Sequence, residues 1–258
     1  MTDGEDIIRF EDLHKAFGPK VVFDGLELGI HPRETLTVIG GSGTGKSVLL
    51  KSLIGLIHPD QGRIFFKGQD ITHYSEQQFL DVRRQVAYVF QGSALFDSLS
   101  VGENIAYPLR EHFPAMGREE LAERVARTLR LVNLPGIEAM RPADLSGGMK
   151  KRVGLARAIA TEPEVILWDE PTTGLDPIST RVIEELILRM QSELGCTSIV
   201  VTHDMPSAFY VSDRIALLAQ RRIVQVGTVE EIQASRVKEV RAFLDARKPR
   251  PVAQGAAG

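Results

Sequence analysis

Short apolar runs alternate with amphipathic stretches along most of this chain. Five of the runs have the length and composition of buried β-strands, and they lie at residues 36–39, 86–90, 165–168, 198–201 and 215–218. Helical patterns separate several of them. Strands that are apolar throughout and joined by helices are typical of parallel sheets, so the pattern predicts an α/β fold with a mostly parallel sheet covered by helices.

Two helices have recognisable ends in the sequence. Asp176 is a good N-cap, Pro177 fits the first helical position, and Gly195 suits the left-handed residue that often ends a helix. The apolar stripe of this predicted helix consists of Ile178, Val182, Leu186, Met190 and Leu194. Thr228 and Glu231 have the spacing of a capping box, which predicts a second, shorter helix.

The regions on either side of the first buried run differ in pattern. Residues 7–30 contain strand-like pieces interrupted by Gly18, Gly25 and Gly29, which predicts an antiparallel layer. Residues 92–160 lack strand signals. They carry a helical apolar stripe at Leu121, Val125, Leu129 and Val132. We therefore expect a helical subdomain inserted between two strands of the core.

These patterns predict a discontinuous core formed by residues 1–91 and 161–248, with residues 92–160 as the insertion. The last ten positions, 249–258, are rich in Pro, Gly and Ala and are predicted to be disordered. With 258 residues, 43% of them hydrophobic and 25% charged, the chain can bury one large core.

Charge and cysteine content narrow the possible functions. A net charge of -3 gives no electrostatic case for binding nucleic acid or an anionic membrane surface. The acidic N-terminus has no apolar signal core, and no stretch approaches the roughly 18 apolar residues of a membrane span. We therefore expect the chain to stay in the cytosol unless a membrane partner holds it. The single Cys196 excludes an internal disulfide and is expected to be a buried thiol.

The clearest chemical signal is a glycine-rich loop between a predicted strand and a predicted helix. Its residues are Gly40, Gly41, Ser42, Gly43, Thr44, Gly45, Lys46 and Ser47, followed by Val48, and they fill every position of the phosphate-binding pattern G-x-x-x-x-G-K-[ST]. The helical pattern runs from residue 48 to 57. Backbone N–H groups of such a loop cradle the α- and β-phosphates, Lys46 reaches the β- and γ-phosphates, and Ser47 is placed to ligate Mg²⁺. The chain is predicted to bind a nucleoside triphosphate.

Two further elements suit phosphate chemistry. Ser146 is a helix N-cap candidate, and Gly147 and Gly148 after it would expose backbone N–H groups, although the same pattern also describes an ordinary capped helix. The apolar run at 165–168 ends in two carboxylates. Asp169 is suited to hold Mg²⁺ through water, and Glu170 to polarise the attacking water.

This ordered set of motifs resembles the ATP-binding cassette (ABC) ATPases over residues 8–244. The resemblance rests on the phosphate loop, Gln91, residues 145–148, the Asp169–Glu170 pair, residues 174–176 and His203. It implies a P-loop (RecA-like) core with an antiparallel β layer and an inserted helical subdomain. It also implies a dimer in which two cassettes sandwich two Mg-ATP head to tail.

Several residue roles follow only from this resemblance. Ser146, Gly147 and Gly148 would contact the γ-phosphate held by the other protomer's loop, and His203 would touch the same group. Gln91 would sense Mg²⁺ and the attacking water, Asp176 would link the two sites, and Phe17 would stack on the adenine. Taken singly, Gln91 also fits a polar loop residue, His203 a strand-end histidine, and Phe17 a core residue.

A stretch that includes residues 90–101 and 104–112, together with Met149, is similar to the Mla/Mce-associated ATPases, which drive phospholipid or sterol transport across bacterial envelopes. That resemblance implies a peripheral subunit on the cytoplasmic face of the inner membrane, bound to a separate permease. A STAS-domain regulator and an MCE-domain periplasmic carrier would be further partners. Ala94, Leu95, Phe96 and Leu99 would contact the permease. The alternatives are the ATPase of a polar-solute importer and a soluble cassette of repair or translation. A non-hydrolysing cassette is disfavoured because Lys46, Asp169, Glu170 and His203 are all present.

Overall fold

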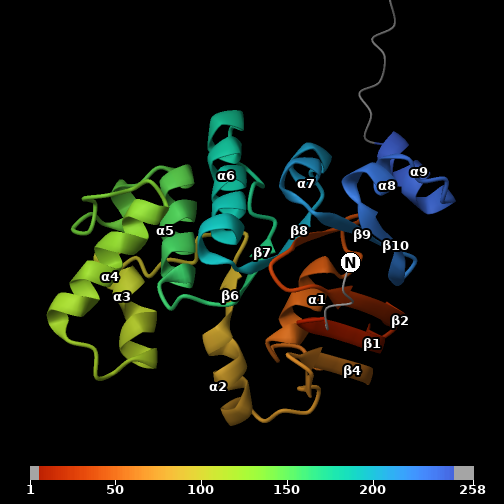
Figure 1. Cartoon of the computed structure of the whole chain (residues 1–258), viewed down its shortest axis with the longest axis horizontal. Coiled ribbons are helices and arrows are strands. Elements are labelled where there is room, and N and C mark those ends of the chain that lie inside the picture. Colours follow the sequence, from red (N-terminus) through yellow and green to blue (C-terminus); the bar gives the residue numbers. More distant parts are fainter. Residues whose placement is uncertain (1–5, 247–258) are drawn as a thin grey trace, which may run out of the picture.

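The computed structural model describes residues 6–246, which form two β-sheets with helices packed around them (Figure 1). The antiparallel sheet has the strand order β2-β1-β4-β5. Its strands are β1 (Ile8–Phe17), β2 (Lys20–Ile30), β4 (Gln61–Phe66) and β5 (Gln69–Asp70). The second sheet has the order β10-β9-β3-β8-β7-β6. Its strands are β3 (Thr35–Ile39), β6 (Val86–Val89), β7 (Val165–Asp169), β8 (Thr197–Thr202), β9 (Arg214–Ala219) and β10 (Arg222–Thr228). Within this sheet the strands from β9 to β6 are parallel, and β10 is antiparallel to β9.

The helices fall into groups that cover different parts of the two sheets (Figure 1). They are α1 (Lys46–Leu53), α2 (Glu76–Gln85), α3 (Val101–His112), α4 (Arg118–Leu131), the 3-10 turn η1 (Pro142–Asp144), α5 (Gly147–Ile159), α6 (Pro177–Leu194), α7 (Met205–Val211), α8 (Val229–Gln233) and α9 (Lys238–Asp245). Helices α3, α4 and α5 lie together at the left of the view, far from the antiparallel sheet at its right.

Successive side chains of β7 point to opposite faces of the sheet, so this strand contributes to two apolar clusters. Val165 and Leu167 point into a cluster that contains both sheets and the buried face of α1. Ile166 and Trp168 point to the opposite face, where they pack with apolar residues of α3 to α6. The Trp168 indole is fully buried and donates its Nε1–H to Ser198 Oγ at 3.2 Å. The parallel sheet therefore carries apolar layers on both faces.

The five strands predicted from apolar runs are confirmed as β3, β6, β7, β8 and β9. Phe90 was predicted to end a strand, but β6 stops at Val89 and Phe90 is exposed. The antiparallel layer is confirmed, yet the expectation that Gly25 and Gly29 interrupt it is wrong, because β2 runs unbroken through both. Gly25 has φ 72, a conformation that a bulge tolerates and that glycine adopts without steric cost.

The helix predicted after Asp176 is confirmed from end to end. Asp176 caps α6 by accepting hydrogen bonds from the backbone N–H of Ile178 and Ser179, and Gly195 ends the helix in the left-handed conformation. The predicted apolar stripe is partly wrong, because Ile178 is 79% exposed. The buried face is shifted by one position toward Ile183 and Ile187, which join Leu186 and Met190. The capping box of Thr228 and Glu231 is confirmed at α8.

The region from Gly92 to Ala160 is helical, with α3, α4, η1 and α5 following one another along the chain. Val125, Leu129 and Val132 of the predicted stripe are buried there, whereas Leu121 is half-buried. These helices share their apolar cluster with Trp168 of the core sheet. Cutting the chain at 92 and 160 therefore stays a prediction. The prediction of a disordered segment at 249–258 lies outside the described residues.

Two local predictions concern helix α1 and the cysteine. Helix α1 begins at Lys46, two residues before the predicted helical pattern, and ends at Leu53, earlier than the residue 57 that the pattern indicated. Cys196 is buried, as predicted, and its thiol donates to the carbonyl of Pro163 at 3.1 Å. Burial raises the pKa of Cys196 to about 11.

Candidate functional site

The glycine-rich loop connects the end of β3 to the start of α1 and is shaped by close approaches of the backbone. A Cβ atom at Gly45, whose φ is 107, would lie 2.4 Å from Val22 and 2.8 Å from Phe23. A Cβ atom at Gly40 would lie 2.6 Å from the carbonyl oxygen of Leu218. Glycine is therefore required at both positions, and the backbone N–H groups near the start of α1 lie at the positive end of its dipole.

The ammonium group of Lys46 is held inside this loop. Only 7% of the residue is exposed, and Nζ donates to the carbonyl oxygens of Gly40 at 3.0 Å and Gly41 at 3.2 Å. The Glu170 carboxylate lies 3.7 Å from the same nitrogen. Thr44 closes the turn by donating its hydroxyl to Gly41 at 2.9 Å. The positive charge is thus fixed at the mouth of the loop, where phosphate oxygens would meet it.

Asp169 is the last residue of β7, is 8% exposed, and has both carboxylate oxygens occupied by hydroxyl donors. Ser47 Oγ donates to Oδ1 and the Tyr88 hydroxyl donates to Oδ2, each at 2.7 Å. Burial and the neighbouring Asp169 raise the pKa of Tyr88 well above its usual range, so the phenol stays a neutral donor. Tyr88 was not singled out in the sequence, because an aromatic residue in an apolar run looks like core.

The oxygen donors that the sequence predicts as metal ligands suit a hard cation. Ser47, Asp169 and Gln91 offer a hydroxyl, a carboxylate and an amide oxygen, which are ligands that Mg²⁺ accepts. Among the residues that the structure describes, no group of three or more His, Cys, Asp and Glu could hold a metal by itself. A Mg²⁺ ion here would need phosphate and water oxygens to complete its shell, as is usual for this ion in nucleotide sites.

Glu170 follows β7 in a left-handed conformation, with φ 50. This conformation is uncommon for a residue with a long side chain, and it turns the carboxylate toward the end of β8. Glu170 Oε2 lies 2.8 Å from Nδ1 of His203 and 3.2 Å from the Thr173 hydroxyl. The Glu170 carboxylate is therefore placed between Lys46 and His203, where it could orient and deprotonate a water molecule.

Many of the predicted site residues line one open groove of about 530 Å³, whereas Asp169, Gly40, Gly41 and Thr44 are not part of its lining. The predicted site residues that line it are Phe17, Ser42, Gly43, Gly45, Lys46, Ser47, Val48, Gln91, Glu170 and His203. Lys20 and Val22 also line it and were missed, since β2 seemed remote from the loop in sequence. Phe17 is 47% exposed, and the Lys15 ammonium lies 5.2 Å from its ring centroid. Phe17 thus presents an aromatic face at the groove, available for stacking on a base.

The predicted segment from Ser146 to Gly148 does not line this groove, and neither does Asp176. Ser146 is confirmed as the N-cap of α5, accepting a hydrogen bond from the Met149 backbone, and a Cβ at Gly147 would meet open space. A Cβ at Gly148 would lie 3.0 Å from Ser179 Oγ, one turn after the Asp176 cap of α6. The N-termini of α5 and α6 are therefore neighbours, and both lie outside the lining of this groove.

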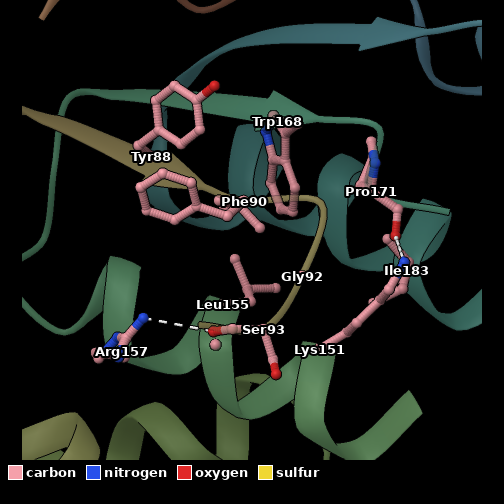
Figure 2. Close-up of a pocket in the computed structure, with 12 residues that line it drawn as sticks. Tyr88, Phe90, Gly92, Ser93, Lys151, Leu155, Arg157, Trp168, Pro171 and Ile183 are labelled. Carbon is pink, nitrogen blue, oxygen red and sulfur yellow. Dashed lines mark hydrogen bonds between the residues drawn. The ribbon is translucent and has the colours of Figure 1, made fainter. Parts of the chain in front are cut away.

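Lys151 is a further residue that the sequence did not mark. Its ammonium donates to the carbonyl oxygen of Pro171 at 3.0 Å (Figure 2) and to that of Thr173 at 2.6 Å. Burial lowers the pKa of Lys151. Lys151 belongs to α5, and the two carbonyls belong to the turn after Glu170. This side chain ties the helical region to the turn that follows Glu170.

Comparisons with known proteins point in one direction. Residues 23–173 match the family model described as ABC transporter. The intermembrane phospholipid transport system ATP-binding protein MlaF of Haemophilus influenzae is 38% identical over 248 residues, covering 96% of this chain and 94% of MlaF. The probable ribonucleotide transport ATP-binding protein mkl of Mycobacterium leprae is 39% identical over 245 residues, 95% of this chain and 70% of mkl. The dimeric, post-hydrolysis structure of the ATP-binding cassette MJ0796 with ADP and Pi superposes with a TM-score of 0.79 at 29% identity, covering 86% of this chain and 98% of that one.

Proposed function

Because this chain belongs to the ABC transporter family, we propose that its ATP hydrolysis drives lipid transport across a bacterial envelope through a separate permease. The chain is an ATP-binding ATPase of that family. The lipid cargo is the proposed part. The observation that carries it is the match to MlaF, which is 38% identical to this chain and aligns along 94% of its own length.

The geometry of the groove supports a separate role for each of these residues during hydrolysis. Lys46 would bind the β- and γ-phosphates, and Ser47, Asp169 and Gln91 would hold the Mg²⁺ that neutralises charge on the phosphates. Glu170 would take the proton from the attacking water. His203, 2.8 Å from Glu170, would keep that carboxylate in place and touch the γ-phosphate. Phe17 would stack on the adenine.

We propose that two copies of the chain close around two ATP molecules. The dimeric structure of MJ0796, a cassette with a TM-score of 0.79 to this chain, supports this arrangement. Ser146 and Gly147 at the start of α5 are exposed, and a helix N-terminus of this kind fits a phosphate supplied from outside the chain. Ser146, Gly147, Gly148 and Asp176 would then act on the nucleotide bound by the partner, which accounts for their absence from the groove in their own chain.

The permease would dock on the helical region beside the Gln91 loop. No helix in residues 6–246 is long and apolar enough to cross a membrane. Phe96 is 43% exposed, its ring centroid lies 5.0 Å from that of the exposed Tyr107, and the Arg157 guanidinium lies 5.5 Å from the Phe96 centroid. Asn104, fully buried, fixes this loop by bonding the backbone N–H and carbonyl of Phe96. A rigid, exposed aromatic of this kind suits an interface anchor. Ala94 is exposed beside it, whereas Leu95 and Leu99 are half-buried and contribute less contact area.

Docking there would hold the chain at the cytoplasmic face of the inner membrane. By the same resemblance, a STAS-domain protein and an MCE-domain periplasmic carrier would complete the assembly. These partners belong to the proposal.

The cargo is tested by reconstituting the chain with its permease in vesicles. Phospholipid or sterol offered with an MCE carrier should stimulate ATP hydrolysis and move between membranes. The parallel arms offer amino acids, sugars and ribonucleotides, the last because mkl is described as a probable ribonucleotide transport protein. Stimulation by one of these polar solutes together with a binding protein, and none by lipid, would reject the lipid assignment.

Replacing Phe96 with aspartate should uncouple the cassette from its permease. We expect permease-stimulated hydrolysis and transport to fall about tenfold or more, as when an aromatic anchor worth ~1.4–2 kcal/mol is lost. Hydrolysis and ATP affinity of the isolated cassette should stay close to wild type. The matched control is Phe113→Asp, because Phe113 is 40% exposed in the same helical region and also lies near a guanidinium, that of Arg124. Equal losses in both variants would count against a docking role for Phe96.

A further inference from the structure

Each oxygen of the buried Asp169 carboxylate accepts a hydrogen bond, one from a helix residue and one from a strand residue. Ser47, at the start of α1, bonds Oδ1, and Tyr88, on β6, bonds Oδ2, each at 2.7 Å. Ser47 belongs to the phosphate loop motif, which accounts for its position. Nothing in that motif requires a tyrosine on β6.

Strand register brings Tyr88 to the carboxylate. β6 and β7 are parallel, and Tyr88 pairs with Leu167, two residues before Asp169. Side chains two residues apart on a strand share a face, so Leu167 and Asp169 lie on the same side of the sheet. Tyr88 packs on the apolar cluster that contains Leu167 and α1. Its ring therefore runs along that face toward the end of β7, and its hydroxyl meets the carboxylate.

Tyr88 also contacts the loop that carries Gln91. Its ring centroid lies 4.4 Å from that of Phe90, with the planes inclined by 38° (Figure 2). Phe90 is 42% exposed and directly precedes Gln91. Contact between two aromatic rings restricts the rotation of both side chains. Tyr88 is thus fixed at both ends, by Asp169 at its hydroxyl and by Phe90 at its ring.

We propose that Tyr88 is a positioning residue for Mg²⁺, acting by fixing the orientation of the Asp169 carboxylate. Partners that orient a metal-binding carboxylate from behind affect metal affinity without touching the metal. Without the Tyr88 hydroxyl, one oxygen of a carboxylate that is only 8% exposed loses its protein donor, and Ser47 alone then fixes the orientation of the group. The inference rests on the ATPase function and not on the lipid cargo.

The test measures how nucleotide binding depends on Mg²⁺, without turnover. A non-hydrolysable fluorescent ATP analogue is titrated into the full chain at rising Mg²⁺ concentration and, separately, in EDTA. Tyr88→Phe keeps the ring and its contact with Phe90. We expect its Mg²⁺ midpoint to rise about tenfold, with unchanged affinity in EDTA and a protein that still folds, although loss of the buried hydrogen bond lowers its unfolding temperature.

Two controls separate the possible results. Tyr74→Phe also removes a hydrogen-bonded phenol, the one that donates to Gln69 at 3.2 Å, and should leave the Mg²⁺ midpoint unchanged. Asp169→Asn should remove most of the Mg²⁺ dependence. If Asp169→Asn does so while Tyr88→Phe matches wild type, the proposal for Tyr88 fails and the metal assignment stands. An equal loss of binding with and without Mg²⁺ in Tyr88→Phe would also overturn it, since that result reports a damaged groove.

Discussion

Replacing Glu170 with glutamine should lower ATP hydrolysis by roughly 10²–10⁴-fold while ATP still binds, because the amide cannot accept the proton of the attacking water. Glutamine keeps the size of the side chain and can still bond to His203, which lies 2.8 Å from the carboxylate. The change also removes a negative charge 3.7 Å from Lys46, so phosphate binding should not weaken. The variant should therefore accumulate as an ATP-bound dimer.

Phosphate release measures the first effect, and light scattering with and without ATP measures the second. Glu164→Gln is a suitable control, because this carboxylate lies just before β7 and pairs with Lys67 at 2.8 Å, outside the groove. It should hydrolyse ATP at the wild-type rate. A Glu170→Gln variant with near-normal turnover would remove Glu170 from its assigned role.

The second large effect is expected from mixed dimers. Gly148→Asp places a carboxylate at the N-terminus of α5, where it would repel the γ-phosphate of the partner's ATP and prevent closure. The variant should still bind ATP at its own loop. Gly148→Asn has the same shape without the charge, and any clash with Ser179, 3.0 Å from a Cβ at this position, is common to both. Greater loss of closure in the aspartate variant isolates the electrostatic part.

Lys46→Ala should instead weaken ATP binding itself, because its charge contacts the phosphates before any reaction occurs. A dimer with one Lys46→Ala subunit and one Gly148→Asp subunit then has one intact composite site and one with both defects. Homodimers of either variant have no intact site. Trapped nucleotide after dilution should therefore appear only in the mixed dimer, at one molecule per dimer. No trapping in a mixed dimer whose subunits fold normally would refute the composite arrangement.

Much of this architecture could be predicted because local rules and global packing agree at those positions. The four residues of β7 that precede Asp169 are all apolar. The phosphate loop has glycines where its backbone approaches Val22 and Leu218 most closely. The caps at Asp176 and Thr228 are also local signals. The caps depend on neighbours within a few residues, and the strand and the loop are continuous sequence patterns, so a sequence displays all of them directly.

The wrong prediction for Ile178 and the missed roles of Tyr88 and Lys151 have a different cause. Ile178 looked like core because it fits the helical period, but it lies in the first turn of α6, beyond the reach of the apolar layer. Tyr88 and Lys151 take their roles from Asp169 and Pro171, which are remote in sequence and adjacent only after the sheet has formed. Periodicity predicts which side of an element is buried, but it does not predict which polar partner lies there.

The buried thiol of Cys196 has a practical consequence for measuring closure of the dimer. It is the only cysteine in the chain, it is 2% exposed, and its pKa of about 11 leaves little thiolate near neutral pH. Maleimide reagents should therefore not modify Cys196. A single cysteine introduced in place of the exposed Asp97 would carry a spin label or fluorophore at one defined place in each protomer, without first replacing Cys196. Distances between the paired labels, followed as ATP is added, would then report the approach of the two helical regions directly.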